Sequence, residues 1–304
     1  MLRKRYDWKL KDREIRLGER TLIMGVVNVT PDSFSDGGKY LDPDRAFARA
    51  LQLEDQGADI IDIGGESTHP GAKRVSEQEE LRRLTPVLKR LRNKLAIPVA
   101  IDTYKSAVAD KALELGAEII NDPSGLTFDP QMVKIAVKHD SGLVVNHMRG
   151  TPETWAKLSP LPNVMAALRQ DLEAAIRRAQ LAGLDKQRIV LDPGIGFGKR
   201  GEQNYDILAR LPELARIGWP ILVGPSRKSF LAQKTEQGKL MASVSAVTAS
   251  ILAGAHIVRV HDVEEMAPAV RVADSILEAG ARIPEAEPET KAPPLRGQSY
   301  RPRA

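Results

Sequence analysis

Short apolar runs recur along the chain, and a longer stretch with helical periodicity separates each run from the next. Each run is brief and bounded by polar residues, which is typical of a strand buried on both faces. The pattern therefore predicts eight strands that alternate with eight helical segments. The predicted strands are residues 22–27, 60–63, 97–101, 118–120, 143–145, 189–191, 221–223 and 257–260.

Helix boundaries can be predicted from residues that favour helix ends. Asp42 precedes a proline, a combination that caps a helix and places proline in its first turn. Residues 76–79 have the serine and glutamate of a capping box. Pro86 lies within the helix that follows, where we expect a kink. Long helices are predicted over residues 163–183 and 263–280.

The number of alternating strands and helices, over about 260 residues, is that of a (β/α)8 TIM barrel in the α/β class. A doubly wound open sheet is the competing fold, but its six or so strands would leave segments unassigned. Alternation ahead of the first run predicts an N-terminal β-hairpin. We divide the chain into a hairpin extension (residues 1–20), the barrel domain (21–282) and a disordered C-terminal tail (283–304) rich in Pro, Glu and Arg.

Composition excludes several classes of protein. The chain has no cysteine, which excludes a disulfide framework, a thiolate metal site and a cysteine nucleophile. The net charge of +5 is spread along the chain, so an anionic small molecule is a better partner than nucleic acid. No apolar run approaches the roughly 20 residues that span a bilayer, and the basic start lacks the apolar core of a signal peptide. We expect a soluble, cytoplasmic protein without a membrane partner.

Polar side chains directly follow the apolar runs. A barrel gathers the carboxyl ends of its strands at one face, so these side chains should meet there and form an active site. The candidates are Asn28, Asp62, Glu66, Thr68, Asp102, Asn121, Asp122, Asn146, His147, Asp192, Ser226, Arg227, Lys228, Arg259 and His261.

The types of these side chains indicate the ligand. Single carboxylates, such as Asp102 and Asp192, suit the N–C–NH2 edge of an aminated heterocycle. Arg259 can stack on a ring or hold phosphate oxygens. Asn28 offers a hard, uncharged oxygen to a cation such as Mg2+, and Phe197 can wall an aromatic co-substrate. The sequence has no serine–histidine–acid triad and no Walker motif, so a covalent nucleophile and a nucleotide P-loop are not expected.

A structural role is an open alternative for five of the candidates. Asp62 and Asp122 can satisfy backbone groups or pair with basic residues. Glu66 can be a structural ion-pair partner, and His147 a satisfied core histidine. Arg227 can hold its loop through an ion pair.

Seven segments, in this order along the chain, resemble dihydropteroate synthase, and the resemblance covers about residues 21–279. Several are long, so their joint occurrence is very specific. The segments are 28–38 (NVTPDSFSDGG), 64–72 (GGESTHPGA), 101–105 (IDTYK), 119–122 (IIND), 191–199 (LDPGIGFGK), 226–229 (SRKS) and 259–262 (RVHD).

The resemblance implies a (β/α)8 barrel of folate synthesis, a transferase and sulfonamide target, usually homodimeric and dependent on Mg2+. The reaction joins 6-hydroxymethyl-7,8-dihydropterin pyrophosphate to p-aminobenzoate, giving 7,8-dihydropteroate and pyrophosphate. By resemblance, the pterin is bound by Asp102, Asn121, Asp192 and Lys228, and Arg259 stacks on it. The pyrophosphate end is contacted by Thr68, Arg259 and His261, and the metal is bound by Asn28. The p-aminobenzoate pocket is formed by Phe34, Pro70, Phe197 and Ser229, and a mobile loop carries Phe34 and Asp36. Lys228, Asp102, Arg259 and His261 are the expected catalytic residues.

The sequence departs from the family pattern at four positions. His69 stands where arginine is usual, and a histidine titrates near neutrality, so we expect weaker or more pH-sensitive pyrophosphate binding. Asn146 replaces a methionine, Pro123 an aliphatic residue, and Pro225 precedes residues 226–229. These changes bear on pocket shape and sulfonamide sensitivity.

Two other functions are compatible with a pterin pocket. A folate-dependent methyltransferase domain shares the barrel, but should lack the elements for pyrophosphate and p-aminobenzoate. A binding module that has lost turnover would keep the pocket. His69 favours this alternative, whereas the presence of Asn28, Lys228 and His261 argues against it. Titration with pterin pyrophosphate and a test for turnover distinguish these readings.

Overall fold

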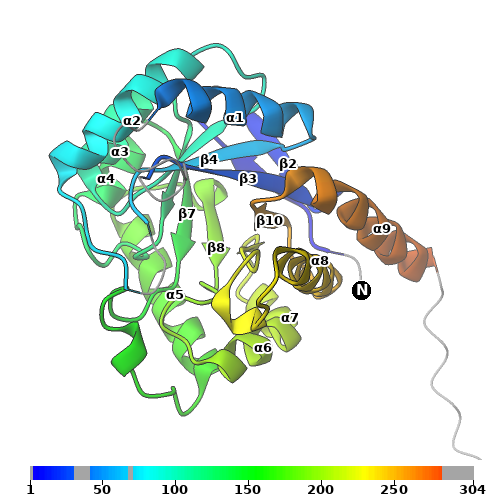
Figure 1. Cartoon of the computed structure of the whole chain (residues 1–304). Coiled ribbons are helices and arrows are strands. Elements are labelled where there is room, and N and C mark those ends of the chain that lie inside the picture. The colour runs from blue at the N-terminus through cyan, green and yellow to red at the C-terminus, as the bar shows by residue number, and fades with distance from the viewer. Residues whose placement is uncertain (1–2, 31–41, 68–70, 283–304) are drawn as a thin grey trace, which may run out of the picture.

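A computed structural model describes residues 3–30, 42–67 and 71–282 (Figure 1). Eight parallel strands form one sheet in the order β8-β7-β6-β5-β4-β3-β10-β9. This sheet, surrounded by helices, confirms the predicted (β/α)8 barrel. The strands are β3 (Leu22–Asn28), β4 (Ile60–Gly64), β5 (Val99–Asp102), β6 (Ile119–Asp122), β7 (Gly142–Asn146), β8 (Ile189–Asp192), β9 (Leu222–Val223) and β10 (Ile257–Val260).

The barrel closes between β8 and β9 through sparse pairing. β9 has only two residues, and a single parallel bridge joins Leu191 to Ile221. The amide of Leu191 also donates to the carbonyl of Pro220 at 2.9 Å. The two ends of the sheet therefore meet, with less hydrogen bonding than elsewhere in the barrel.

The helices lie outside the strands, as expected for this fold (Figure 1). The interval between β8 and β9 contains two helices in place of the one predicted, because Arg210 leaves the helical conformation between them. The helices are α1 (Pro43–Asp55), α2 (Glu77–Leu91), α3 (Ser106–Glu114), α4 (Met132–Lys138), α5 (Val164–Leu181), α6 (Gly201–Ala209), α7 (Leu211–Ala215), α8 (Glu236–Leu252) and α9 (Val263–Arg282).

The predicted helix starts are confirmed with one correction. Asp42 caps α1 by accepting from the amide of Asp44. Ser76 caps α2 by accepting from the amide of Glu79 at 3.2 Å. The capping box is only half formed, however, because the carboxylate of Glu79 pairs with Arg82 and Arg83 instead of reaching back. α2 is one helix through its internal proline.

The predicted N-terminal hairpin is confirmed. β1 (Tyr6–Lys9) and β2 (Glu14–Leu17) pair antiparallel. Trp8, Leu10 and Leu17 are buried in one cluster with interior residues from the amino-terminal ends of the barrel strands. The hairpin therefore covers the lower opening of the barrel. The predicted tail lies outside the described residues.

The barrel interior consists of two layers of side chains. Alternate residues of a strand point to the same face, so a residue and the one two positions later both point inward. The lower layer is apolar and belongs to the cluster under the hairpin; its members are Ile60, Ala100, Ile119, Val144, Val190, Leu222 and Ile257. The upper layer, two residues later on every strand except β3, comprises Asp62, Asp102, Asn121, Asn146, Asp192, Gly224 and Arg259. On β3 the residue at this level is the apolar Val26, which pairs with Asp62.

A second apolar core lies between the sheet and the helices. The residues between the two layers on each strand, such as Ile61, Ile101 and Ile120, point outward into this core. Burial of such a side chain contributes about 1.5–3 kcal/mol, so the packed helices hold the barrel and its upper layer in place. Within the described residues, each helix is too short or too polar to cross a membrane.

Candidate active site

A pocket opens at the carboxyl ends of the strands, as the sequence predicts. It is lined by six of the strand-end residues that the sequence predicts, together with Phe197 and its neighbours. The lining residues are Asp102, Asn121, Pro123, Asn146, Asp192, Ile195, Phe197, Gly224, Lys228 and Arg259.

Arg259 lines this pocket and joins two carboxylates. Its Nε donates to Asp62 Oδ2 at 2.6 Å, and its Nη2 donates to Asp102 Oδ2 at 2.7 Å. Asp62 also accepts from Asn121 Nδ2 at 3.1 Å. Charge-assisted bonds of this kind are stronger and shorter than neutral ones. Asp62 therefore pairs with a basic residue, as its structural alternative predicts. Its partners, Arg259 and Asn121, are however both predicted site residues.

The pocket lining and the buried Asp62 beside it together contain one more carboxylate than cation. Three acids, Asp62, Asp102 and Asp192, surround Arg259 and Lys228. Burial raises the pKa of Asp102 to about 7, although the Arg259 charge opposes the rise. Burial also raises the pKa of Asp192. Burial, followed by the charge of Arg259, lowers the pKa of Lys228 to about 8. Groups that ionise near neutrality are typical of functional sites.

The loop after β8 places an aromatic wall beside Lys228. The Lys228 ammonium lies 4.2 Å from the centroid of the Phe197 ring, a cation–π contact. Trp155 packs edge-on against Phe197, at 5.4 Å between centroids. Gly194 is in the left-handed region, and a Cβ there would lie 2.0 Å from the carbonyl oxygen of His147. Only glycine fits this turn, which brings Phe197 to the pocket.

Lys199, the last residue of this loop motif, is buried and ties the loop to β7. Its Nζ donates to the carbonyls of His147 at 2.6 Å and Gly194 at 2.7 Å. His147 is itself buried, with Nε2 3.0 Å from Asp171, and burial lowers its pKa to about 2. His147 therefore has the structural role rather than a place in the pocket.

Arg227 holds the loop that presents Lys228. Its guanidinium donates to Asp262 at 2.7 and 2.8 Å and to Glu236 at 2.6 Å. Arg227 has a φ of +58°, which is costly for a residue with a side chain. These ion pairs stabilise that conformation. The structural alternative for Arg227 is thus supported.

His261 lies beside this loop. Its Nδ1 is 3.1 Å from Ser226 Oγ, and its amide donates to the same oxygen at 3.3 Å. Burial and the charges of Arg259 and Lys228 lower its pKa to about 3, so the imidazole is neutral. A neutral imidazole next to two cations is available as a hydrogen-bond partner for an anion.

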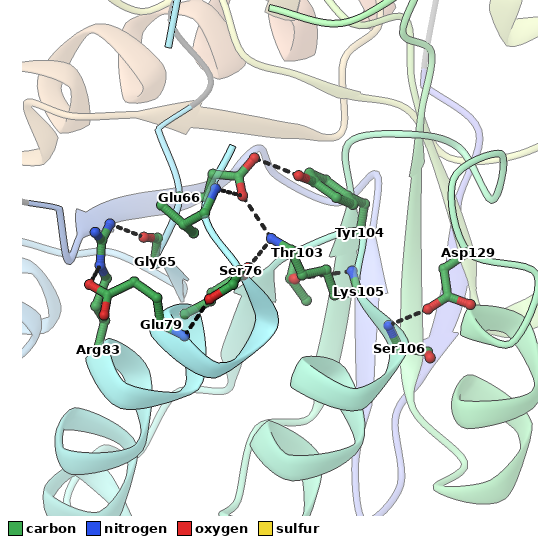
Figure 2. Close-up of polar contacts among 12 residues, drawn as sticks. Gly65, Glu66, Ser76, Glu79, Arg83, Thr103, Tyr104, Lys105, Ser106 and Asp129 are labelled. Carbon is green, nitrogen blue, oxygen red and sulfur yellow. Dashed lines mark hydrogen bonds and ion pairs between the residues drawn. The ribbon is translucent and has the colours of Figure 1, made fainter. Parts of the chain in front are cut away.

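Glu66, at the end of β4, ties the next loop to β5 (Figure 2). Its carboxylate accepts from the amide of Val75 at 3.1 Å, from Tyr104 Oη at 2.7 Å and from Lys105 Nζ at 2.7 Å. Lys105 also pairs with Glu80 on α2, whose pKa burial raises. We call Glu66, Glu80 and Lys105 the loop anchor. It lies beside the strand end that bears Asp102, and gives Glu66 a structural role.

Asp122 also has the structural role, accepting from Ser124 and from the amide of Leu126. Two of the four family departures contact one another: Asn146 Nδ2 donates to the carbonyl of Pro123 at 2.6 Å.

Asn28 ends β3, paired with Gly64 of the next strand. Ser229 is exposed and directly follows Lys228.

Five residues considered in the sequence lie outside the described residues: Phe34, Asp36, Thr68, His69 and Pro70. Among the residues that are described, no group of three or more His, Cys, Asp or Glu side chains could hold a metal ion.

The fold and the pocket define a barrel enzyme for a planar, aminated heterocycle. A family model described as pterin binding enzyme matches residues 24–261. The dihydropteroate synthase of Synechocystis is 44% identical over 89% of this chain and 92% of its own length. The chain therefore belongs to the pterin-binding enzymes and, among these, to the dihydropteroate synthase family.

Solved structures of the family are similar throughout the chain. Dihydropteroate synthase of Yersinia pestis, with a sulfonamide drug complex, has a TM-score of 0.84 at 37% identity, covering 90% of this chain and 99% of that one. The Xanthomonas albilineans enzyme with 4-aminobenzoic acid has a TM-score of 0.83 at 37% identity, covering 92% and 100%.

Proposed function

We propose that the chain condenses 6-hydroxymethyl-7,8-dihydropterin pyrophosphate with p-aminobenzoate, forming 7,8-dihydropteroate and pyrophosphate in folate synthesis. The observation that carries this proposal is the pocket itself. It combines Asp102, Asn121 and Asp192 with Lys228 and Arg259 at the carboxyl end of a family barrel. The Xanthomonas albilineans enzyme in complex with 7,8-dihydropteroate, at a TM-score of 0.79, supports the product.

The pocket suits the polar edge of a pterin. Asp102 and Asp192 offer carboxylate oxygens, and Asn121 lines the pocket between them. These acceptors match the amino group and ring N–H groups of a pterin. Lys228 supplies a donor for the ring's acceptors, and Arg259 a planar guanidinium that can lie against its face.

The pyrophosphate end would lie at the rim formed by Asn28, Arg259 and His261. Asn28 supplies one neutral oxygen, and the described chain has no carboxylate cluster that would form a cage for a metal. This donor set fits Mg2+, which takes most of its ligands from water and substrate phosphates. When bound, Mg2+ would offset the charge that develops on the leaving pyrophosphate.

The chemistry requires no enzyme nucleophile. The bond between the pterin methylene and the pyrophosphate oxygen breaks, leaving an electron-poor carbon that the ring stabilises. The neutral amine of p-aminobenzoate forms the new C–N bond and then loses a proton. Arg259 and His261 would steady the departing anion. Phe197, held by Trp155 and next to Lys228, and Ser229 would line the p-aminobenzoate side, with Phe34 and Pro70 as further expected contacts.

A homodimer in the cytoplasm is the assembly and location that we propose. Large apolar side chains are exposed on the neighbouring helices α8 and α9: Met241 and Leu252 on one, Val272 and Ile276 on the other. Exposed apolar side chains on neighbouring helices favour a protein partner. Light scattering of the wild type and of Met241→Lys/Ile276→Lys tests this: the wild type should have twice the mass of the variant. Equal monomer masses would contradict it.

Pyrophosphate release tests the proposed reaction. The purified protein is mixed with pterin pyrophosphate, p-aminobenzoate and Mg2+, and each component is omitted in turn. We expect release that requires all three, and its suppression by a sulfonamide that competes with p-aminobenzoate. Tight pterin binding without release would favour a binding module. Methyl transfer from a folate would favour the methyltransferase reading.

A further inference from the structure

We propose that Asp62 is a positioning residue that determines which pteridines the pocket accepts. It acts by fixing the orientation of the Asn121 amide, so that the amide oxygen faces the ligand. The inference rests on the proposed pterin function and concerns a residue that does not itself line the pocket. If the Asn121 amide could rotate freely, it could present either its oxygen or its NH2 group, and the pocket would bind other pteridines as well as pterin.

The position of Asp62 carries the first step. Its side chain is fully buried on β4, below the pocket, and does not belong to the pocket lining. Its Oδ2 accepts hydrogen bonds from Asn121 Nδ2 at 3.1 Å and from Arg259 Nε at 2.6 Å. Asp62 thus touches two lining residues from beneath and leaves the contact with ligand to them.

The chemistry of the carboxylate carries the second step. A carboxylate oxygen that is paired with a guanidinium accepts hydrogen bonds and does not donate them, and Asp62 Oδ2 is paired with Arg259 Nε. Asn121 must therefore turn its NH2 group toward Asp62. Its oxygen then faces away, toward the pocket. An amide has nearly the same shape in both orientations, so without Asp62 little would distinguish them.

The resulting set of acceptors carries the third step. Asp102, Asp192 and the Asn121 oxygen present acceptors to the ligand, and only a donor-rich edge satisfies them. A 2-amino-4-oxopteridine has such an edge, whereas a 2,4-dioxopteridine places an oxygen where the amino group should be. A site built to bond an N–H group rejects an analogue that lacks it, since the site's own polar groups are then left unpaired.

The other oxygen of Asp62 supports a functional role. Oδ1 is buried and has no hydrogen-bond partner among the described residues. A half-satisfied buried carboxylate costs stability, and an apolar side chain of similar size would avoid that cost. A buried polar atom without a hydrogen-bond partner lowers stability, and such atoms are expected mainly at functional sites.

Titration with two pteridines tests the inference. Pterin and 2,4-dioxopteridine are titrated into the wild type, Asp62→Asn and Asp62→Leu, and the ratio of their dissociation constants is measured. We expect the preference for pterin to fall by about tenfold in Asp62→Leu, in line with one misdirected hydrogen bond. Asp62→Asn keeps the shape of the side chain and should give a smaller fall. Arg259 meets both ligands alike, so the ratio isolates the amide.

Asp122→Asn is the matched control, because Asp122 is equally buried but bonds only Ser124 and Leu126. It should lower the melting temperature without changing the ratio. In Asn121→Ala the ratio should also fall, and adding Asp62→Asn should lower it no further. Equal losses of affinity for both pteridines in the Asp62 variants would overturn the inference. A wild type that binds neither pteridine would overturn the proposed function, and this inference with it.

Discussion

The two layers of the barrel interior share a backbone but differ in chemistry. Ile60 and Asp62 on β4, or Val190 and Asp192 on β8, are separated by one residue and point the same way. The lower member packs under the hairpin, and the upper member is an aspartate that faces Arg259 or the pocket. The comparison indicates that stability and recognition occupy successive layers of the same strands, so that each should be separable by mutation.

The two layers are also closed differently. Trp8, Leu10 and Leu17 cover the lower layer with apolar surface. The upper layer satisfies part of its charge internally, through Arg259 and its two carboxylates. Three acids facing two cations leave acceptors available for a ligand. The proposed ligand therefore completes the upper layer in the way that the hairpin completes the lower one.

The largest expected effect is at the hairpin that covers the lower layer. Trp8→Ala removes a side chain that is only 1% exposed and the bond from its Nε1 to the carbonyl of Arg188. We expect the free energy of unfolding to fall by about 3–5 kcal/mol, measured by urea denaturation, with pterin affinity unchanged in the folded protein. In Trp8→Phe the free energy of unfolding should fall by less than in Trp8→Ala. A fall in pterin affinity parallel to the loss of stability would contradict the separation of the layers.

The loop anchor should have the next largest effect. Lys105→Met leaves Glu66 and Glu80 without their cation, and we expect a loss of about 2–3 kcal/mol at pH 7. Burial raises the pKa of Glu80. As the pH falls, a larger fraction of Glu80 is protonated and no longer needs a cation. The loss of stability in Lys105→Met should therefore be smaller at pH 5 than at pH 7, which thermal denaturation at the two pH values would detect.

Lys138→Met is the control for the loop anchor. Lys138 pairs with Asp110 at 2.7 Å, but its side chain is 55% exposed. An exposed pair contributes about 0–1 kcal/mol, so this variant should change little. A loss as large as that of Lys105→Met would show that burial of the anchor is irrelevant.

Removal of one charge from the upper layer should affect binding and not stability. In Asp192→Asn we expect pterin affinity to fall by about 10- to 100-fold, the value of one charged hydrogen bond. Burial already disfavours the charged form of Asp192 and raises its pKa, so the melting temperature should stay equal or rise. Calorimetric titration and a thermal melt measure the two quantities. The exposed Asp206→Asn is the control, and a lower melting temperature in Asp192→Asn alone would count against the account.

The smallest expected effect is a pH dependence of ligand affinity. Lys228 is charged below its lowered pKa of about 8. Affinity for pterin pyrophosphate should therefore decline above pH 8, by up to about tenfold per pH unit. Below pH 7 protonation of Asp102, whose pKa burial raises to about 7, lowers the affinity as well. Lys228→Gln should bind more weakly and show a flat profile between pH 8 and 9. A decline of equal size in that variant would assign the titration to another group.

Much of the fold could be predicted from the sequence because its determinants are local. The period of the apolar runs and the cap residues Asp42 and Ser76 predict strands and helix starts directly. The break at Arg210 and the shortness of β9 could not be predicted, since both depend on how the barrel closes. The carboxylate of Glu79 has nearby arginines that compete with the capping box, which the motif alone does not reveal.

The site was predicted as a set of residues but not as a network. Strand-end positions identified Asp102, Asn121, Asp192, Lys228 and Arg259, because every strand of a barrel ends at one face. The bonds of Asp62 to Arg259 and Asn121 join β4 to β10 and β6. Such bonds depend on residues distant in sequence, and no local pattern predicts them. The two-residue spacing from an apolar to a polar residue on six of the eight strands would have indicated the layers.

A crystal structure of the protein with bound pterin tests the central claim most directly. The account predicts the ring against Asp102, Asn121 and Asp192, with the Asn121 amide nitrogen still on Asp62 and the hairpin unchanged. A ring bound elsewhere, for example in the cleft of about 400 Å³ between the hairpin and Trp219, would contradict it. A ring in the upper pocket that receives the Asn121 nitrogen in place of its oxygen would contradict the role of Asp62.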